Sequence, residues 1–305
     1  MILSRFFGQS KPIVFLILAS YLSIHFWVNT LQTSAQVKFT DAGKYILFLL
    51  IFLGINFIVK RNKINQQHTY AAFSMLILST FFPAFYLNLH YLIPAFIVVL
   101  GIRRIISLKT QIDTKKKIFD ASLWFFIASL FQPYLLFLLL LVFFGVLQYT
   151  LYNPRNLFIP IIAWVCGGLF YTAFQLWETD KWVFFYETYT QFGWNNFGAI
   201  WEKNKLILIL LIPFLVWVLL GITKVISKAQ LALKTSLVML IFAFVIIFFG
   251  WMFSNQIEAA GLAISFIPLS MLAGASLEVK MKPIIKEILI ALLIIASLIT
   301  LFMPI

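Results

Sequence analysis

The residues of this chain best suited to chemistry are carboxylates in its polar segments. Six of the ten acidic residues lie in or beside stretches that we assign below to the outer side of a membrane: Asp41, Glu178, Asp180, Glu187, Glu202 and Glu258. A carboxylate in such a position can act as general base for an acceptor hydroxyl or hold a divalent cation. Asp41 is where such a base would be expected, because it lies on the first outer segment. The alternative is that these are solvated loop carboxylates, which any outer loop would carry.

Other kinds of site have little support in the sequence. It contains no GxxxxGK[ST], GxGxxG or HExxH motif, and His25, His68 and His90 are far apart along the chain. We interpret each histidine as an interfacial or capping side chain. Cys166, the single cysteine, lies in an apolar run and is expected to be a small hydrophobic side chain. No cofactor is evident, although carboxylate chemistry at an outer loop would accommodate a divalent cation.

The composition identifies lipid as the solvent for most of the chain. Of its 305 residues, 63% are hydrophobic and 11% are charged, whereas soluble domains have about 25% charged residues and about 45–50% apolar ones. The net charge of +13 would suggest a nucleic-acid partner in a soluble protein. Here the basic residues form short clusters between apolar runs, a pattern typical of membrane topology signals. We therefore expect a lipid bilayer, and no nucleic acid, as the partner.

Hydropathy predicts an all-α, polytopic membrane helical bundle that forms a single domain over residues 1–305. A helix of about 20 residues crosses about 30 Å of hydrocarbon. The first apolar run lacks a cleavage site and is read as an uncleaved span. Apolar runs predict about eleven membrane segments, at residues 13–28, 45–59, 69–86, 88–102, 118–131, 134–149, 157–177, 206–223, 235–253, 259–277 and 288–304.

The distribution of Lys and Arg predicts the orientation of these segments. With a cytosolic amino terminus and a periplasmic carboxyl terminus, eighteen basic residues lie inside and five outside. The stretch 118–149 would be about 48 Å long as one helix, and one helix there would change the counts to 14 and 9. We therefore predict a hairpin that turns at Gln132-Pro133. Its first arm is about 21 Å long, so the hairpin is either short or re-entrant.

Three polar segments connect the predicted spans and could bind ligands. Residues 29–44 and 178–205 are predicted to be periplasmic, and the second is rich in aromatic residues that favour a membrane surface, among them Trp182, Tyr186 and Trp194. The basic cytosolic loop 103–117 begins with Arg103 and Arg104. Each cation could attract anionic lipid head groups by about 1 kcal/mol. Plain topology signalling is the alternative explanation for this loop.

Several stretches of the amino-terminal half resemble a known family. The sequences are FFGQSKP (6–12), INFIVKRN (55–62), LSTFFPAF (78–85), FIVVLGIRRIISLKT (96–110) and KKKIFDASLWFFIASLF (115–131). They resemble an uncharacterised family of flavobacterial (Bacteroidota) integral membrane proteins, which implies an inner-membrane location. No functional residue carries over from that family. The first half also loosely resembles the large multi-span glycosyltransferase fold.

Two functions are consistent with these patterns, and enzymatic activity is left open. The first is a glycosyltransferase-like protein that uses a polyprenyl-phosphate sugar at the periplasmic face, with Asp41 as base. The alternative is a non-catalytic membrane subunit or assembly factor of a cell-envelope complex. The expected partners are accordingly a lipid-linked sugar or envelope-complex subunits. An ion-coupled transporter is disfavoured, because no acidic residue falls near the middle of a predicted span.

Overall fold

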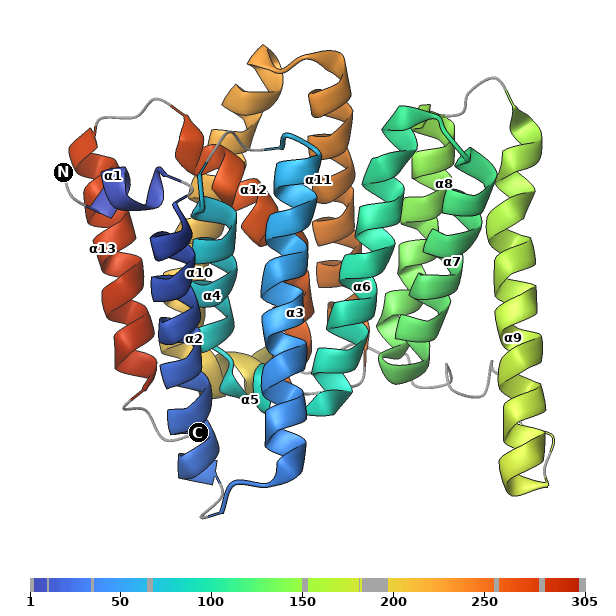
Figure 1. Cartoon of the computed structure of the whole chain (residues 1–305), viewed down its shortest axis with the longest axis horizontal. Coiled ribbons are helices and arrows are strands. Elements are labelled where there is room, and N and C mark those ends of the chain that lie inside the picture. The colour runs from blue at the N-terminus through green and yellow to red at the C-terminus, as the bar shows by residue number, and fades with distance from the viewer. Residues whose placement is uncertain are drawn as a thin grey trace.

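The computed structural model describes residues 3–9, 11–33, 36–64, 68–149, 153–180, 182, 197–254, 258–279 and 283–301. The regular elements in these ranges are helices that lie side by side and alternate in direction (Figure 1). In chain order they are α1 (Leu3–Phe7), α2 (Pro12–Thr33), α3 (Phe39–Arg61), α4 (Tyr70–Thr80), α5 (Pro83–Leu87), α6 (Leu89–Ser107), η1 (Leu108–Thr110), α7 (Thr114–Phe131), η2 (Pro133–Phe137), α8 (Leu138–Tyr149), η3 (Pro154–Leu157), α9 (Phe158–Thr179), α10 (Phe197–Lys228), α11 (Leu231–Met252), η5 (Ala259–Ser265), α12 (Phe266–Glu278) and α13 (Pro283–Thr300). The η elements are short 3-10 helices.

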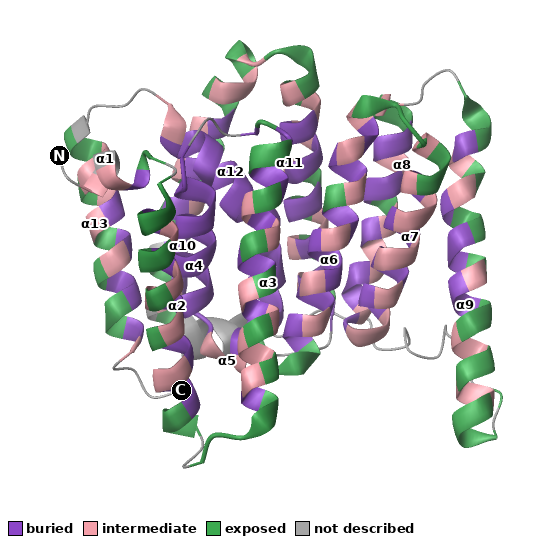
Figure 2. Cartoon of the chain, in the orientation of Figure 1, coloured by how far each residue is buried: buried purple, intermediate pink, exposed green. Residues whose placement is uncertain are grey.

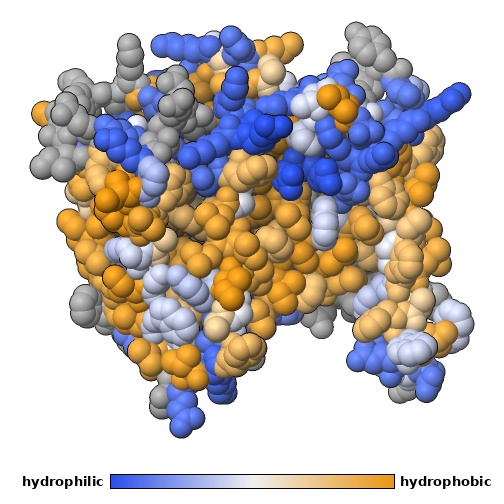
Figure 3. Space-filling model, viewed as in Figure 1, coloured by the Kyte–Doolittle hydropathy of each residue, from blue (hydrophilic) through white to orange (hydrophobic). Residues whose placement is uncertain are grey.

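Seven helical segments among the described residues are long and apolar enough to cross a membrane. They are Pro12–Thr33, Phe39–Arg61, Leu89–Thr110, Pro154–Thr179, Ile207–Lys228, Leu231–Met252 and Ala259–Glu278. Apolar side chains form a broad zone across the middle of the molecule, below a hydrophilic upper surface and above smaller hydrophilic patches at the lower left and lower right (Figure 3). Exposed Leu, Ile and Phe side chains of this kind rarely form large patches on soluble proteins. The helices therefore indicate a multi-pass membrane protein, as the sequence predicts.

A cluster of basic side chains lies at one end of the bundle. We call it the basic end and define it by Lys60, Arg61, Arg104, Lys117 and Lys228, all in the first or last turns of their helices. Figure 3 shows hydrophilic side chains along this upper surface. Lys and Arg at helix ends can extend beyond the apolar zone to water and lipid head groups.

Hydrogen bonds between distant segments hold both ends of the bundle together. At the basic end, the Thr69 N–H donates to the Phe7 carbonyl at 3.1 Å, and Lys109 Nζ donates to the Asn62 carbonyl at 2.9 Å. At the opposite end, Gln132 Nε2 donates to the His90 carbonyl at 3.2 Å. Such bonds fix which helix ends lie on the same side of the bundle.

The turn predicted at Gln132-Pro133 is present and separates α7 from α8. The Gln132 N–H ends α7 by donating to the Ala128 carbonyl at 3.1 Å. Pro133 then begins η2, where its missing N–H leaves no unpaired donor. The residues 118–149 are therefore a hairpin, and α7 alone is about 27 Å long. This length exceeds the predicted arm because α7 begins at Thr114.

Two segments predicted as loops are largely helical. Residues 29–33 belong to α2 and residues 39–44 to α3, which leaves a short connection where the sequence predicts the outer segment 29–44. Most of the predicted basic loop 103–117 is likewise helical, because α6, η1 and α7 cover all of it except 111–113. Hydropathy marks where a helix leaves the apolar zone, whereas the helix itself continues until a capping residue stops it.

The centre of the bundle is the pair α4 and α12, which pack against each other and are buried along their lengths (Figure 2). Small residues of α12 allow close approach of its neighbours. A Cβ added to Gly221 of α10 would lie 2.5 Å from Ser276 Cβ of α12. The glycine is therefore required for the distance between these two helices.

Candidate functional site

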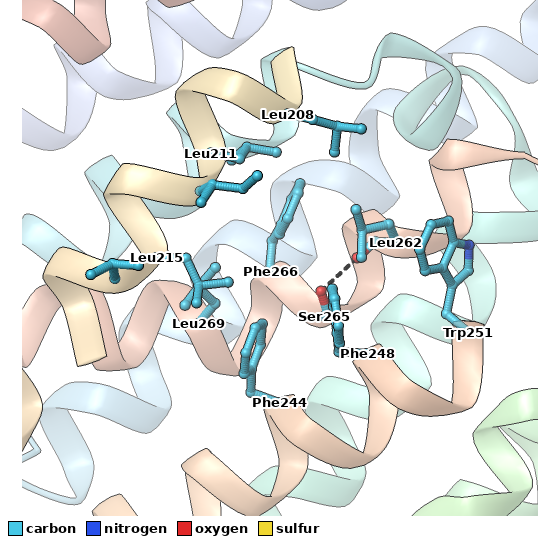
Figure 4. Close-up of a pocket in the computed structure, with 12 residues that line it drawn as sticks. Leu208, Leu211, Leu215, Phe244, Phe248, Trp251, Leu262, Ser265, Phe266 and Leu269 are labelled. Atoms are coloured by element: carbon cyan, nitrogen blue, oxygen red, sulfur yellow. Dashed lines mark hydrogen bonds between the residues drawn. The ribbon is translucent and has the colours of Figure 1, made fainter. Parts of the chain in front are cut away.

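An apolar pocket of about 220 Å³ lies between α10, α11, η5 and α12 (Figure 4). Its walls are aliphatic and aromatic side chains, with Ser265 as the polar exception. The Ser265 hydroxyl donates to the Leu262 carbonyl at 2.7 Å, so its proton is already used within the chain. The lining residues are Leu208, Leu211, Ile212, Leu215, Val216, Phe244, Phe248, Trp251, Leu262, Ser265, Phe266 and Leu269. A pocket of this composition can hold hydrocarbon but offers no ready partner to a polar ligand.

The pocket reaches the lipid-facing surface of the bundle. Ile212 and Val216 are about half exposed, whereas Leu208 and Leu211 on the same helix are buried. From Leu208 to Val216 the pocket follows α10 for about 12 Å. Apolar cavities of about 150 Å³ remain dry and admit benzene-sized ligands, so this larger pocket has room for part of a lipid chain.

A lysine and a glutamate lie near the pocket at the end opposite the basic end. Lys205 is exposed and precedes the lining residue Leu208 by three positions, which places it about one helical turn away on α10. Glu258 directly precedes η5, and its carbonyl accepts a hydrogen bond at 3.3 Å from the indole N–H of the lining residue Trp251. The Tyr91 hydroxyl donates to Glu258 Oε2 at 2.6 Å.

Asp41, the predicted base, is engaged in capping its own helix. Lys38 N–H donates to Asp41 Oδ2 at 2.9 Å, and Lys44 Nζ donates to Oδ1 at 2.9 Å. The side chain is only 7% exposed. This arrangement satisfies the start of α3 and favours a structural role for the carboxylate. The predicted catalytic role of Asp41 stays a prediction.

The other predicted outer residues lie at the end of α9 or outside the described residues. Trp182 is 70% exposed, just beyond α9, where Glu178 and Asp180 are exposed as well. Tyr186, Glu187, Trp194 and the side chain of Glu202 lie outside the described residues. α9 packs against α7 at the edge of the bundle, so Trp182 is not brought to the pocket (Figure 1).

Arg103 and Arg104 lie at the basic end and contact other side chains of the chain. Arg104 Nη2 is 3.1 Å from Asp120 Oδ2, which pairs α6 with α7. The Arg103 guanidinium lies 5.0 Å from the centre of the Phe57 ring on α3. Both therefore help to hold helices together, and a role in binding anionic lipid stays a prediction. Asp41 and these two arginines lie at opposite ends of the bundle.

The pocket could not be found from the sequence. Its lining residues come from three long apolar helices whose mutual packing the hydropathy does not specify, and each helix alone is a typical membrane helix. The sequence identifies Glu258 as an outer acid, but the contact of its backbone carbonyl with Trp251 depends on the fold of 258–265. Among the described residues, no group of three or more His, Cys, Asp or Glu side chains is placed to hold a metal ion.

Comparisons with protein-family models, with curated proteins and with solved structures give no match for this chain. The resemblance to the flavobacterial membrane family therefore stays an expectation.

Proposed function

We propose that the chain binds a polyprenyl-phosphate-linked sugar and transfers the sugar at the outer face of the bacterial inner membrane. The observation that carries this proposal is the apolar pocket between α10, α11 and α12, which opens to the lipid-facing surface and lies about one helical turn from Lys205 on α10. An isoprenoid chain is wholly apolar and enters such a pocket from the bilayer without losing a hydrogen bond.

The two charged residues at the outer end supply the remaining chemistry of the proposal. The Lys205 ammonium attracts the phosphate of the lipid, as lysines commonly do at phosphate sites. The Glu258 carboxylate takes the proton of an acceptor hydroxyl as its oxygen attacks the anomeric carbon, and the lipid phosphate leaves. Lysine in this position reduces the need for a divalent cation, although such a cation would act in the same way.

The orientation belongs to this proposal. Eighteen of the 23 basic residues are assigned to the cytosolic side by the positive-inside pattern. That assignment makes the basic end cytosolic and the pocket's charged end periplasmic, with about eleven membrane segments. A lipid-linked sugar would then be used on the periplasmic side.

A second candidate function is suggested by the geometry of Asp41. One carboxylate oxygen accepts a hydrogen bond from the Lys38 N–H and the other from Lys44 Nζ, so the residue predicted to be catalytic has a sufficient structural role. If Glu258 does not act as a base either, the chain would be a non-catalytic subunit or assembly factor of a cell-envelope complex. Stoichiometric co-purification with other envelope proteins in mild detergent would favour this candidate.

Lipid binding by the purified full chain tests the proposed function. In lipid nanodiscs, native mass spectrometry with undecaprenyl phosphate as the probe should show a bound adduct. Leu211→Trp should reduce its affinity at least about tenfold, because the indole fills a pocket of this size. Leu220→Trp is the matched control, since Leu220 faces lipid on the same helix outside the pocket.

Substitutions of Lys205 and Glu258 distinguish binding of the lipid from transfer of the sugar. Lys205→Gln should weaken the adduct because the phosphate loses its cation. Glu258→Gln should retain the adduct and abolish sugar transfer in a membrane assay with labelled lipid-linked sugar. Equal binding of the probe by Leu211→Trp and Leu220→Trp would contradict the proposal, as would full transfer by Glu258→Gln.

A further inference from the structure

A second group of polar side chains lies inside the bundle, away from the apolar pocket. α2 buries one stripe of residues, and His25 and Asn29 belong to this stripe, each only 1% exposed. Along α2, His25 is about 20 Å from the basic end of the helix and about 12 Å from its other end. An ionisable side chain at this depth is a functional hypothesis in itself.

His25 and Asn29 both have polar atoms without a partner among the described residues. Neither ring nitrogen of His25 makes a hydrogen bond there, and neither does Oδ1 of Asn29. The Asn29 amide nitrogen is satisfied, because it donates to the His25 carbonyl at 2.8 Å and to the Tyr86 hydroxyl at 2.7 Å. Buried groups of this kind are costly, and native proteins usually satisfy them with protein or ordered water.

The spacing of the two residues places them on the same face of α2. Side chains four positions apart on a helix are neighbours. A single water molecule can therefore bridge a His25 ring nitrogen and Asn29 Oδ1, and two polar partners are the minimum that a buried water needs.

We propose that His25 is a proton-binding site inside the bundle, served by one water molecule that bridges its ring to Asn29. In the neutral state the water donates one hydrogen to the unprotonated ring nitrogen and the other to Asn29 Oδ1. A proton from the aqueous phase adds to that nitrogen's lone pair and gives an imidazolium. The imidazolium N–H then donates to the water oxygen, while the water still donates to Asn29 Oδ1.

The ring beside His25 carries a hydroxyl that belongs to a chain of hydrogen bonds between helices. The Tyr21 ring lies 4.6 Å from the His25 ring, centre to centre, and the Tyr21 hydroxyl is 2.6 Å from Ser297 Oγ of α13. Ser297 Oγ is in turn 3.0 Å from Thr80 Oγ1 of α4. These hydroxyls link α2, α13 and α4 through hydrogen bonds and can reorient when His25 changes charge.

The titratable groups on the elements around α2 define the field at His25. They are Tyr21 on α2 itself, Tyr45 on α3, Tyr70 on α4 and Tyr86 on α5. The charged side chains lie at the helix ends: Asp41, Lys44, Lys60 and Arg61 on α3, and Lys286 and Glu287 on α13. None of these groups makes a hydrogen bond to a His25 ring nitrogen among the described residues.

Solid-state NMR of the full chain in lipid bilayers tests this inference. The chain has three histidines, so ¹⁵N-histidine labelling with His68→Gln and His90→Gln assigns the His25 signals. We expect a water-to-imidazole cross-peak for His25 and conversion of its neutral pattern to the imidazolium pattern on acidification. Asn29→Leu should abolish the cross-peak.

A control variant on the same helix and the behaviour of the wild-type chain complete the test. Ser20→Leu on the exposed face of α2 should leave the cross-peak intact. The inference is overturned if wild-type His25 stays neutral and shows no contact with water over the whole pH range in which the bundle is folded. That result would describe a dry core histidine, whatever the folding of Asn29→Leu.

Discussion

The carboxylate of Asp41 accepts hydrogen bonds from a backbone N–H and an ammonium at the start of α3. A side chain used in this way satisfies one of the unpaired donors of the first helical turn and complements the positive end of the helix. The sequence predicted its position beside the first outer connection. It could not predict these partners, because they depend on the local geometry of residues 38–44.

Asp41→Asn distinguishes the capping role from the catalytic one. If Asp41 caps α3, the variant should lose about 1 kcal/mol of stability and retain sugar transfer. Lys44→Gln should lose less stability than Asp41→Asn, because it removes only one of the two donors to the Asp41 carboxylate. The measurements are the thermal unfolding midpoint in detergent and transfer in membranes. A variant with unchanged stability and no transfer would restore Asp41 as the base.

His25 shows the limit of sequence reasoning for a single residue. Its position near the outer end of an apolar run suggested an interfacial side chain, yet it is only 1% exposed, and its ring lies 4.6 Å, centre to centre, from that of Tyr21. The signal that could have identified it is its four-residue spacing from Asn29, which puts both on one helical face. Which face is buried depends on the packing of helices that are distant in sequence.

At the scale of elements, hydropathy and proline predict most helices but misplace many of their ends. The hairpin at Gln132-Pro133 is present because proline has no N–H to continue α7. The run predicted at 69–86 is instead divided into α4 and α5, with Pro83 at the start of α5. The pocket was not predictable, since it depends on how α10, α11 and α12 pack.

The contact between α10 and α12 gives a prediction about packing. Gly221→Ala should destabilise the bundle by about 1–3 kcal/mol, because the new methyl group would meet Ser276 Cβ and, at 3.3 Å, its Cα. The thermal unfolding midpoint in detergent measures this effect. Gly43→Ala is the matched control, since a Cβ there meets nothing within 4 Å. Equal midpoints for the two variants would show that α10 and α12 are not in close contact.

For the whole molecule, composition was sufficient to predict a helical membrane bundle, and the structure agrees with this coarse description. The finer description, about eleven segments with a cytosolic amino terminus, is part of the proposal. It depends on charges such as Lys60, Arg61 and Arg104 lying together at one end of the bundle. Lys205 and Glu258 lie on the outer side of the membrane only if the basic end faces the cytosol. The proposed sugar transfer at the outer face depends on the same orientation.

The side of the membrane on which each end lies is therefore the most direct test. In a Cys166→Ser background, Lys63→Cys reports on the basic end and Trp182→Cys on the opposite end, and both positions are exposed. A membrane-impermeant maleimide added to intact cells should label Trp182→Cys, and should label Lys63→Cys only after the membrane is opened. Labelling of Lys63→Cys in intact cells, with Trp182→Cys protected, would contradict the orientation and the proposed outer site.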